Sequence, residues 1–271
     1  MRIAIPGLNL SMTLTRAPFR FELARPRQLH AGAGSATRQT NYTGDGLTVE
    51  SRILDALQSD RFTSAYSAGI QTPHKIGVGG DLRIHWRVYT CLWAAEHALS
   101  LPGDFVECGV NTGIISRAIC DYVNFASVPK QFFLFDTFAG IPESQAAPDE
   151  REHVRSKNAR IYRDCYEDTK RTFAPFPNVR LVRGMVPDTL AAQPIEKVSY
   201  LSIDMNLVFP EIAALEFFWD RLVPGGIVVL DDYAFAGHRH QHEAVDAFAL
   251  RRNVPVYTSP TGQGLILRPP S

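Results

Sequence analysis

The sequence predicts an α/β fold: a seven-stranded, mostly parallel sheet with an antiparallel last strand, helices on both faces and an N-terminal helical extension. Two observations carry this prediction. From residue 104 onward, short apolar runs alternate with helical segments, a pattern typical of parallel strands joined by right-handed crossovers. The last two apolar runs are separated by too few residues for a crossover, so these two strands must pair antiparallel.

The expected strands and helices alternate along the chain. Strands are expected over 104–110, 131–136, 178–184, 198–204 and 225–232, and helices over 113–126, 186–193, 209–221 and 240–252. The final two strands, 255–260 and 264–269, are joined by a turn at Thr261-Gly262-Gln263. The polar segment 143–173 predicts a helical insertion, which is long enough for an active-site lid and equally compatible with a solvated surface insertion.

Three regions of different composition divide the chain. Residues 1–47 are expected to form a partly irregular N-terminal arm, rich in Pro, Arg, Gly, Ser and Thr. Residues 48–103 form a helical extension or cap, whose main helix covers about 81–99 and stops at Pro102-Gly103. That helix could cap a ligand cleft, but we favour core packing for its apolar stripe. Residues 104–271 form the α/β domain, which is expected to be catalytic.

Composition excludes several classes of function. The chain of 271 residues has 28 Lys and Arg against 28 Asp and Glu, and this balance argues against a nucleic-acid partner. No apolar run is long enough to cross a membrane, and Met1–Leu14 lacks the unbroken apolar stretch of a secretory signal. None of the four cysteines forms a C-x-x-C pair, so we expect a reducing, cytoplasmic location without disulfides.

The turn after the first strand, Glu107 to Gly113, predicts a ligand-binding loop. Gly109 and Gly113 let the backbone approach a ligand, and Asn111 lies between them. Asp136 ends the next strand, where a carboxylate can bind the two hydroxyls of a ribose. The spacing is not the G-x-G-x-x-G of dinucleotide sites, and Glu107 suits a cationic ligand better than a phosphate. These features favour adenosylmethionine over NAD, the alternative being a joint with packing glycines only.

Three carboxylates follow the fourth and fifth strands of the predicted sheet. Asp204 ends one strand, and Asp231 and Asp232 end the next. Because parallel strands end at one edge of the sheet, these groups would repel one another unless a cation or proton joins them. Hard oxygen ligands favour Mg²⁺, to which Asn206 could add a neutral oxygen. The alternative is that one aspartate caps a helix and another faces water.

Three histidines, His238, His240 and His242, follow the fifth strand. Alternate residues point apart at the start of a helix, so we do not expect this group to bind zinc. The loop is expected to lie over the pocket. His238 is therefore a candidate for substrate contact or for a base near neutral pH, whereas a solvated helix start explains the other two.

Four segments in this order resemble class I adenosylmethionine-dependent methyltransferases, which have a Rossmann-like fold. They are VECGVNTG, LFDTFAGIP, the G-x-x-x-D-T-L of Gly184 to Leu190, and PGGIVVLDDY. The branch that the sequence resembles is the macrocin O-methyltransferase (TylF-like) family, which acts on sugar hydroxyls of natural products. The resemblance covers about residues 104–269.

The resemblance implies roles for particular residues. The cofactor residues would be Glu107, Gly109 and Gly113 at the methionine end, Asp136 at the ribose, Thr137 and Phe138 beside the adenosine, and Gly184 and Asp188 at the adenine edge. Asp204 would also border the cofactor. Asp204, Asp231 and Asp232 match the family's magnesium-binding acids, and Asp204 matches its proposed base. The sequence departs from the family's D-G-D-x-Y, because it has Asn206 for the second acid and Val208 for the aromatic residue.

The resulting hypothesis is O-methyl transfer from adenosylmethionine to a hydroxyl of a small molecule, with Mg²⁺ as a possible second cofactor. A homodimer is expected, with the arm 1–47 at its interface. One rival is an NAD-dependent oxidoreductase, which would need a dinucleotide loop and a Tyr–Lys or His catalytic pair. A second rival is a non-catalytic module that binds adenosylmethionine but has lost the acceptor site.

Overall fold

A computed structural model describes residues 2–4, 11–13, 40–75 and 81–270. The chain divides into two units, Met1–Arg38 and Gln39–Ser271. In the first unit, strand β1 (Arg2–Ala4) pairs antiparallel with β2 (Ser11–Thr13). Most of the predicted arm 1–47 lies outside the described residues. Its last part belongs to the second unit, where β3 (Thr40–Gly44) and β4 (Leu47–Glu50) form a hairpin.

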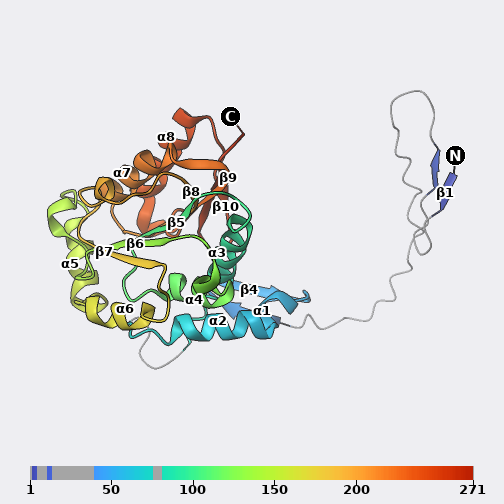
Figure 1. The fold of residues 1–271 in the computed structure, drawn as a ribbon, viewed down its shortest axis with the longest axis horizontal. Coiled ribbons are helices and arrows are strands. Elements are labelled where there is room, and N and C mark those ends of the chain that lie inside the picture. The colour runs from blue at the N-terminus through green and yellow to red at the C-terminus, as the bar shows by residue number, and fades with distance from the viewer. Residues whose placement is uncertain (1, 5–10, 14–39, 76–80, 271) are drawn as a thin grey trace. The chain divides into compact units, whose positions relative to one another are not determined.

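The second unit is built on a seven-stranded sheet with the order β10-β11-β9-β8-β5-β6-β7 (Figure 1). Its five parallel strands are β5 (Asp104–Cys108), β6 (Phe132–Asp136), β7 (Val179–Arg183), β8 (Val198–Ile203) and β9 (Leu222–Leu230). The last strand, β11 (Gly264–Leu267), runs antiparallel between β9 and β10 (Tyr257–Thr258). The predicted fold class is therefore confirmed, including the reversed last strand.

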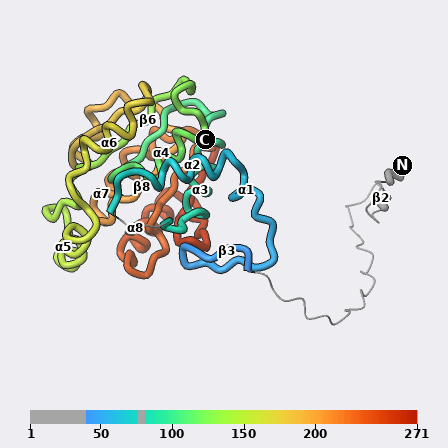
Figure 2. The backbone as a smooth tube through the Cα atoms, turned by 90° about the horizontal axis from the view of Figure 1, so that it is seen from below, coloured from blue at the N-terminus to red at the C-terminus, as the bar shows by residue number. Residues whose placement is uncertain are grey.

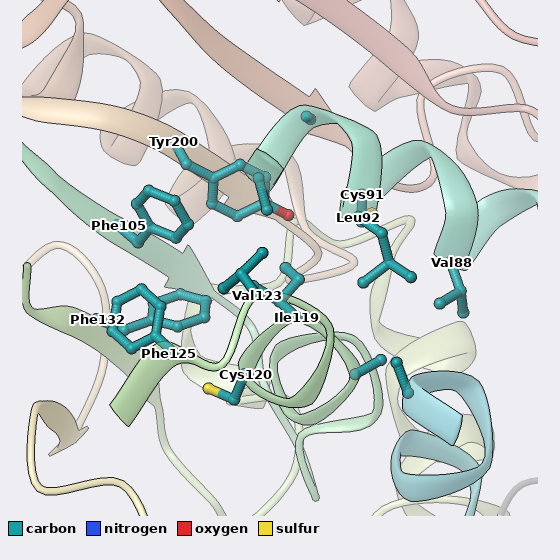
Figure 3. Close-up of a cluster of buried hydrophobic side chains, with 14 of the residues drawn as sticks. Val88, Cys91, Leu92, Phe105, Ile119, Cys120, Val123, Phe125, Phe132 and Tyr200 are labelled. Atoms are coloured by element: carbon teal, nitrogen blue, oxygen red, sulfur yellow. The ribbon is translucent and has the colours of Figure 1, made fainter. Parts of the chain in front are cut away.

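Alternate residues of the central strands build two cores, one on each face of the sheet. Phe105 of β5 faces helices α2 (Asp60–Ile70), α3 (His85–Ala98) and α4 (Ile114–Tyr122). Figure 3 shows this core, where the rings of Phe105 and Tyr200 lie 5.2 Å apart. Val106 and Cys108 face the other way, toward α7 (Val208–Trp219) and α8 (Arg239–Arg252). Side chains thus alternate between the two faces of the sheet along each strand. The cores take up the residues within the strands, and the residues that follow the strand ends can be polar.

Several predicted helices are shorter in the structure than the sequence pattern suggests. The helix expected over 81–99 begins at His85, because Arg83 has a positive φ of 53°. The helix expected over 113–126 ends at Tyr122, and Asn124 also has a positive φ, of 49°. Between 186 and 193 only a single 3-10 turn forms, Leu190–Ala192. Left-handed backbone at the first two of these positions breaks the hydrogen-bond ladder of an α-helix.

Two segments outside the alternating strands and helices frame the sheet. The insertion 143–173 is helical as predicted, with α5 (Arg151–Arg160) and α6 (Tyr166–Phe173) after a 3-10 turn at Glu143–Gln145. The hairpin β3–β4 precedes the short helix α1 (Asp55–Gln58). Figures 1 and 2 show α5 and this hairpin on opposite sides of the second unit. Among the described residues, no helix has the length and apolar character needed to cross a membrane.

Candidate active site

A cavity of about 360 Å³ lies at the carboxyl ends of the central strands, which is where open α/β sheets bind ligands. Eight of the ten predicted cofactor residues line it: Glu107, Gly109, Asn111, Asp136, Thr137, Phe138, Gly184 and Asp204. Asp231 lines it as well, whereas Gly113 and the exposed Asp188 do not. The volume lies within the range of about 300–1,000 Å³ that small-molecule sites usually have.

The two glycines of the first loop serve different purposes. A Cβ on Gly109 would lie 1.8 Å from the carbonyl oxygen of Asp204, and the φ of Gly109 is +90°. Gly109 therefore allows the ends of β5 and β8 to pass in contact. Gly113 has a φ of +87° and a Cβ there would meet the ring of Phe173 at 2.5 Å. Gly113 thus starts helix α4 and packs against α6, away from the cavity wall.

Asp136 braces the ligand loop from the neighbouring strand. Its Oδ2 accepts hydrogen bonds from the backbone N–H groups of Val110 and Asn111, at 2.6 and 2.7 Å. Its Oδ1 accepts one from the N–H of Phe138 at 2.6 Å. Oδ1 also accepts a longer hydrogen bond, of 3.4 Å, from the hydroxyl of Thr137, and a ribose hydroxyl would compete for this weaker contact. The ribose contact stays a prediction, and the bracing of the loop is an additional role that the sequence did not indicate.

Glu107 carries an unsatisfied carboxylate oxygen at the cavity. The residue is 3 % exposed, and its Oε2 has no hydrogen-bond partner among the described residues. Burial raises the pKa of Glu107 well above its usual range, and the negative charges of Asp231 and Asp136 raise it further. A cation beside Oε2 would satisfy this oxygen and stabilise the ionised form. The residues present therefore fit a ligand with an ammonium group, such as the methionine end of adenosylmethionine.

Of the three strand-end aspartates, Asp231 is buried and Asp204 and Asp232 are half-buried, and their partners are other side chains. Asp231 accepts hydrogen bonds from Arg87 Nη1 and from Gln263 Nε2, each at 3.0 Å. Asp204 Oδ1 accepts one from Asn206 Nδ2 at 3.1 Å. Burial raises the pKa of Asp204 well above its usual range, and so do the charges of Asp231 and Asp232. A carboxylate with a raised pKa accepts a proton more readily than an exposed one.

These side chains do not fit the predicted magnesium site of Asp204, Asp231 and Asp232. Both oxygens of Asp231 already accept hydrogen bonds from protein donors. The amide oxygen of Asn206 accepts one from the ammonium of Lys157. Within the described part of the chain, no group of three or more His, Cys, Asp or Glu side chains is arranged to hold a metal ion. Cationic side chains thus bond Asp231 and Asn206, whose oxygens a divalent ion at this site would need.

Sequence reasoning missed these two cations. Arg87, from α3, bonds Asp231 and also pairs with Asp45 of the hairpin turn at 2.8 Å. Lys157, from α5, lies 3.4 Å from His238 Nε2 in addition to bonding Asn206. The one signal for Arg87 was a cation in the apolar stripe of its helix. Lys157 stands in a polar segment where nothing distinguishes it from its charged neighbours.

The three histidines contact different acidic side chains. His238 is buried: its Nδ1 lies 2.8 Å from Gln241 Nε2, and its Nε2 lies 3.5 Å from Asp232 Oδ2. His240 pairs with Asp149 at 3.2 Å, and His242 lies on the other side, 3.3 Å from Asp246. Burial and the charge of Lys157 lower the pKa of His238 to about 4. His238 is therefore neutral at pH 7, and it does not line the cavity.

The strand order, the reversed last strand and the position of the cavity define the class I methyltransferase fold. The structure titled O-methyltransferase NovP shares it, with a TM-score of 0.60 and 23% identity, covering 68% of this chain and 80% of that one. The sequence profile described as macrocin-O-methyltransferase (TylF) matches residues 87–259. The chain belongs to this family.

Curated relatives share about half of their length with this chain. An 8-demethyl-8-(2,3-dimethoxy-alpha-L-rhamnosyl)-tetracenomycin-C 4'-O-methyltransferase from Streptomyces olivaceus is 31% identical over 144 residues, which are 49% of this chain and 54% of the relative. A demethyldecarbamoylnovobiocin O-methyltransferase from Streptomyces niveus is 28% identical over 144 residues, with the same coverage. The chain thus spans about half the length of the curated relatives that it matches.

Proposed function

We propose that the protein transfers a methyl group from adenosylmethionine to a hydroxyl group of a small molecule. The observation that carries this proposal is the unpartnered Oε2 of Glu107, at the wall of the same cavity that Asp204 lines. One carboxylate suits the ammonium of the cofactor, and the other suits the proton that an acceptor hydroxyl must lose. Membership of the macrocin O-methyltransferase family supports the same reaction.

We assign the part of the cavity at the carboxyl ends of β5 and β6 to the cofactor. Glu107 binds the ammonium group, and Asp136 holds the loop from Val110 to Asn111 in place while its Oδ1 meets the ribose. Thr137, Phe138 and Gly184 border the adenosine. The negative charge of Glu107 in this loop disfavours a pyrophosphate, so an NAD-dependent oxidoreductase is not favoured.

The acceptor half is assigned to Asp204. When bound, adenosylmethionine supplies a methyl group on a positively charged sulfur, and that sulfur–carbon bond breaks as the acceptor oxygen bonds to the carbon. Asp204 takes the proton of the hydroxyl, and its raised pKa makes it a better base than an exposed aspartate. Most of the rate comes from holding the two reacting atoms in line, because the methyl group is already activated.

The acceptor class is taken from the relatives. Their names describe methylation of a rhamnosyl group on tetracenomycin C and of demethyldecarbamoylnovobiocin. We therefore propose a hydroxyl of a sugar or of another natural product as the methyl acceptor of this chain. The acceptor would enter beside Asp204, Met205 and Asn206, which line the cavity next to one another.

Turnover with a deuterated methyl donor tests this assignment. The purified chain is incubated with glycosylated natural products, and products are measured by mass spectrometry alongside adenosylhomocysteine. Asp204→Asn should lower kcat by about 10²–10⁴, the usual contribution of a general base. Asp220→Asn, at an exposed position outside the cavity where Asp220 pairs with Arg252, is the matched control and should leave kcat unchanged. Full turnover by Asp204→Asn would remove the base from the proposal.

We also propose that the chain forms a homodimer in the cytoplasm, with the arm 1–47 at the interface. All four cysteines are buried and unpaired, which supports a reducing compartment. Light scattering of the full chain should give twice the monomer mass of 30.2 kDa. A chain lacking residues 1–38 should give one monomer mass, and a monomeric full chain would contradict the proposed interface.

A further inference from the structure

Lys157 carries its positive charge from the insertion to Asn206, which lines the cavity. Its helix, α5, lies on the opposite side of the second unit from the hairpin that carries Asp45 (Figures 1 and 2). The ammonium donates a hydrogen bond to the amide oxygen of Asn206, and it lies 3.4 Å from His238 Nε2. The side chain is half-buried, which distinguishes it from the exposed cations on the same helix.

Asn206 connects this ammonium to Asp204. Its Oδ1 accepts from Lys157, while its Nδ2 donates to Asp204 Oδ1 at 3.1 Å and to the hydroxyl of Tyr162 at 3.3 Å. Asn206 itself is 6 % exposed and has a positive φ of 60°. Hydrogen bonds at both the oxygen and the nitrogen of its amide fix its side chain. The orientation of Asp204 therefore depends on a chain of hydrogen bonds that runs from Lys157 through Asn206 to Asp204.

Lys157 adds a second positive charge at this edge of the sheet, beside that of Arg87. Asp231 is paired with Arg87, which also serves Asp45. That leaves Asp204 and Asp232, two half-buried carboxylates that repel each other. The ammonium of Lys157 reaches this pair through two side chains: it bonds Asn206, which bonds Asp204, and it lies 3.4 Å from His238, which lies 3.5 Å from Asp232. Without this ammonium, one positive charge fewer would oppose the repulsion between the two carboxylates, and a cation from solution would be attracted more strongly.

We propose that the ammonium of Lys157 is the resident cation of the acceptor site, that it excludes a divalent metal, and that it positions Asp204 through Asn206. The metal-excluding part follows from the charges and contacts of the chain. The positioning of a base rests on the proposed methyl transfer. Lys157 is thus a positioning residue, and the reaction of this chain needs no metal.

Metal binding tests the charge argument without any cofactor or acceptor. Mn²⁺ is titrated into the full chain, and bound ion is measured by water-proton relaxation. Lys157→Ala should bind Mn²⁺ at least about tenfold more tightly than the wild type, because a nearby unit charge no longer repels the dication. Lys157→Gln, which keeps a hydrogen-bond donor for Asn206, is the second variant should the alanine variant fail to fold. Equal Mn²⁺ affinity of the wild type and the neutral variants would overturn the proposal.

Arg155→Ala is the matched control, because Arg155 lies on the same helix and is paired only with Glu143 at the surface. Its Mn²⁺ affinity should equal that of the wild type. In turnover, EDTA should leave wild-type kcat unchanged, and Lys157→Gln should lower kcat while KM for adenosylmethionine stays the same. Loss of wild-type activity in EDTA that Mg²⁺ restores would overturn the metal-free reaction. Failure to find any turnover would count against the proposed function but would leave the Mn²⁺ result valid.

Discussion

Gly109 lies where β5 leaves the sheet, and its missing side chain decides how closely two strand ends approach. The carbonyl oxygen of Asp204 occupies the space in which a Cβ would stand, and the backbone is left-handed at this position. Both Glu107 and Asp204 depend on this contact for their positions around the cavity. The glycine that the sequence marked as a ligand contact is therefore first a condition for assembling the site.

Gly109→Ala should destabilise the fold by about 2–4 kcal/mol or more, because it combines a backbone clash with an unfavourable φ. Urea unfolding followed by circular dichroism measures this difference. Gly237→Ala is the control, since a Cβ there meets nothing within 4 Å and its φ is not in the left-handed range. If the two variants were equally stable, the close approach of β5 and β8 would be wrong.

At the scale of elements, helix α7 fixes the loop that carries Asp204. Glu211, in its first turn, accepts a hydrogen bond at Oε1 from the backbone N–H of Met205, at 3.2 Å. The side chain is buried at 5 % exposure. Burial, together with the charge of Asp232, raises the pKa of Glu211 from 4.5 to about 8. The folded protein therefore keeps a proton on Glu211 that the unfolded chain has already released at neutral pH.

This proton gives stability a pH dependence with a definite sign. The folded state binds the proton more tightly, so the contribution of Glu211 is fully present below pH 4.5 and is lost as pH rises to about 8. Glu211→Gln keeps an acceptor for the Met205 N–H but cannot titrate. It should flatten the fall of the unfolding free energy in this window by up to about 1.4 kcal/mol per pH unit. Identical slopes for the variant and the wild type in urea unfolding would contradict a protonated Glu211.

Two elements from outside the alternating strands and helices supply the cations of the site. Helix α3 delivers Arg87 to Asp231, and helix α5 delivers Lys157 to Asn206. The hairpin adds Asp45, whose carboxylate holds the guanidinium from the other side. The insertion and the N-terminal extension are therefore parts of the acceptor site as well as covers of the sheet.

At the scale of the whole molecule, the sheet could be predicted because its signals are local. Each strand is a short apolar run, and the short link before β11 requires the reversal. The strand-end residues Glu107, Asp136 and Asp204 followed, since parallel strands place their ends at one edge. Arg87, Lys157 and Asp45 could not be predicted in the same way. They reach the site from segments far apart in the chain, and no local periodicity records where such segments dock.

The docking of distant segments also explains why the magnesium site predicted at Asp204, Asp231 and Asp232 does not fit the structure. Adjacent strand ends indicated three carboxylates in proximity, and the structure places them at the same edge of the sheet, with Asp231 buried and the other two half-buried. The sequence could not show that Arg87 and Lys157 arrive there to balance the charge. Asp188 and Gly113 likewise follow strand-end patterns, but the backbone turns one toward solvent and packs the other against Phe173.

The central claim is that the cavity binds adenosylmethionine through Glu107, and calorimetric titration of the full chain tests it most directly. The wild type should bind adenosylmethionine and not NAD. Glu107→Gln should weaken binding by about tenfold or more, since a charge-assisted hydrogen bond contributes about 1.5–3 kcal/mol. Glu243→Gln, at a surface pair with Arg239, should bind as the wild type does. Unchanged affinity of Glu107→Gln, or binding of NAD in place of adenosylmethionine, would contradict the account.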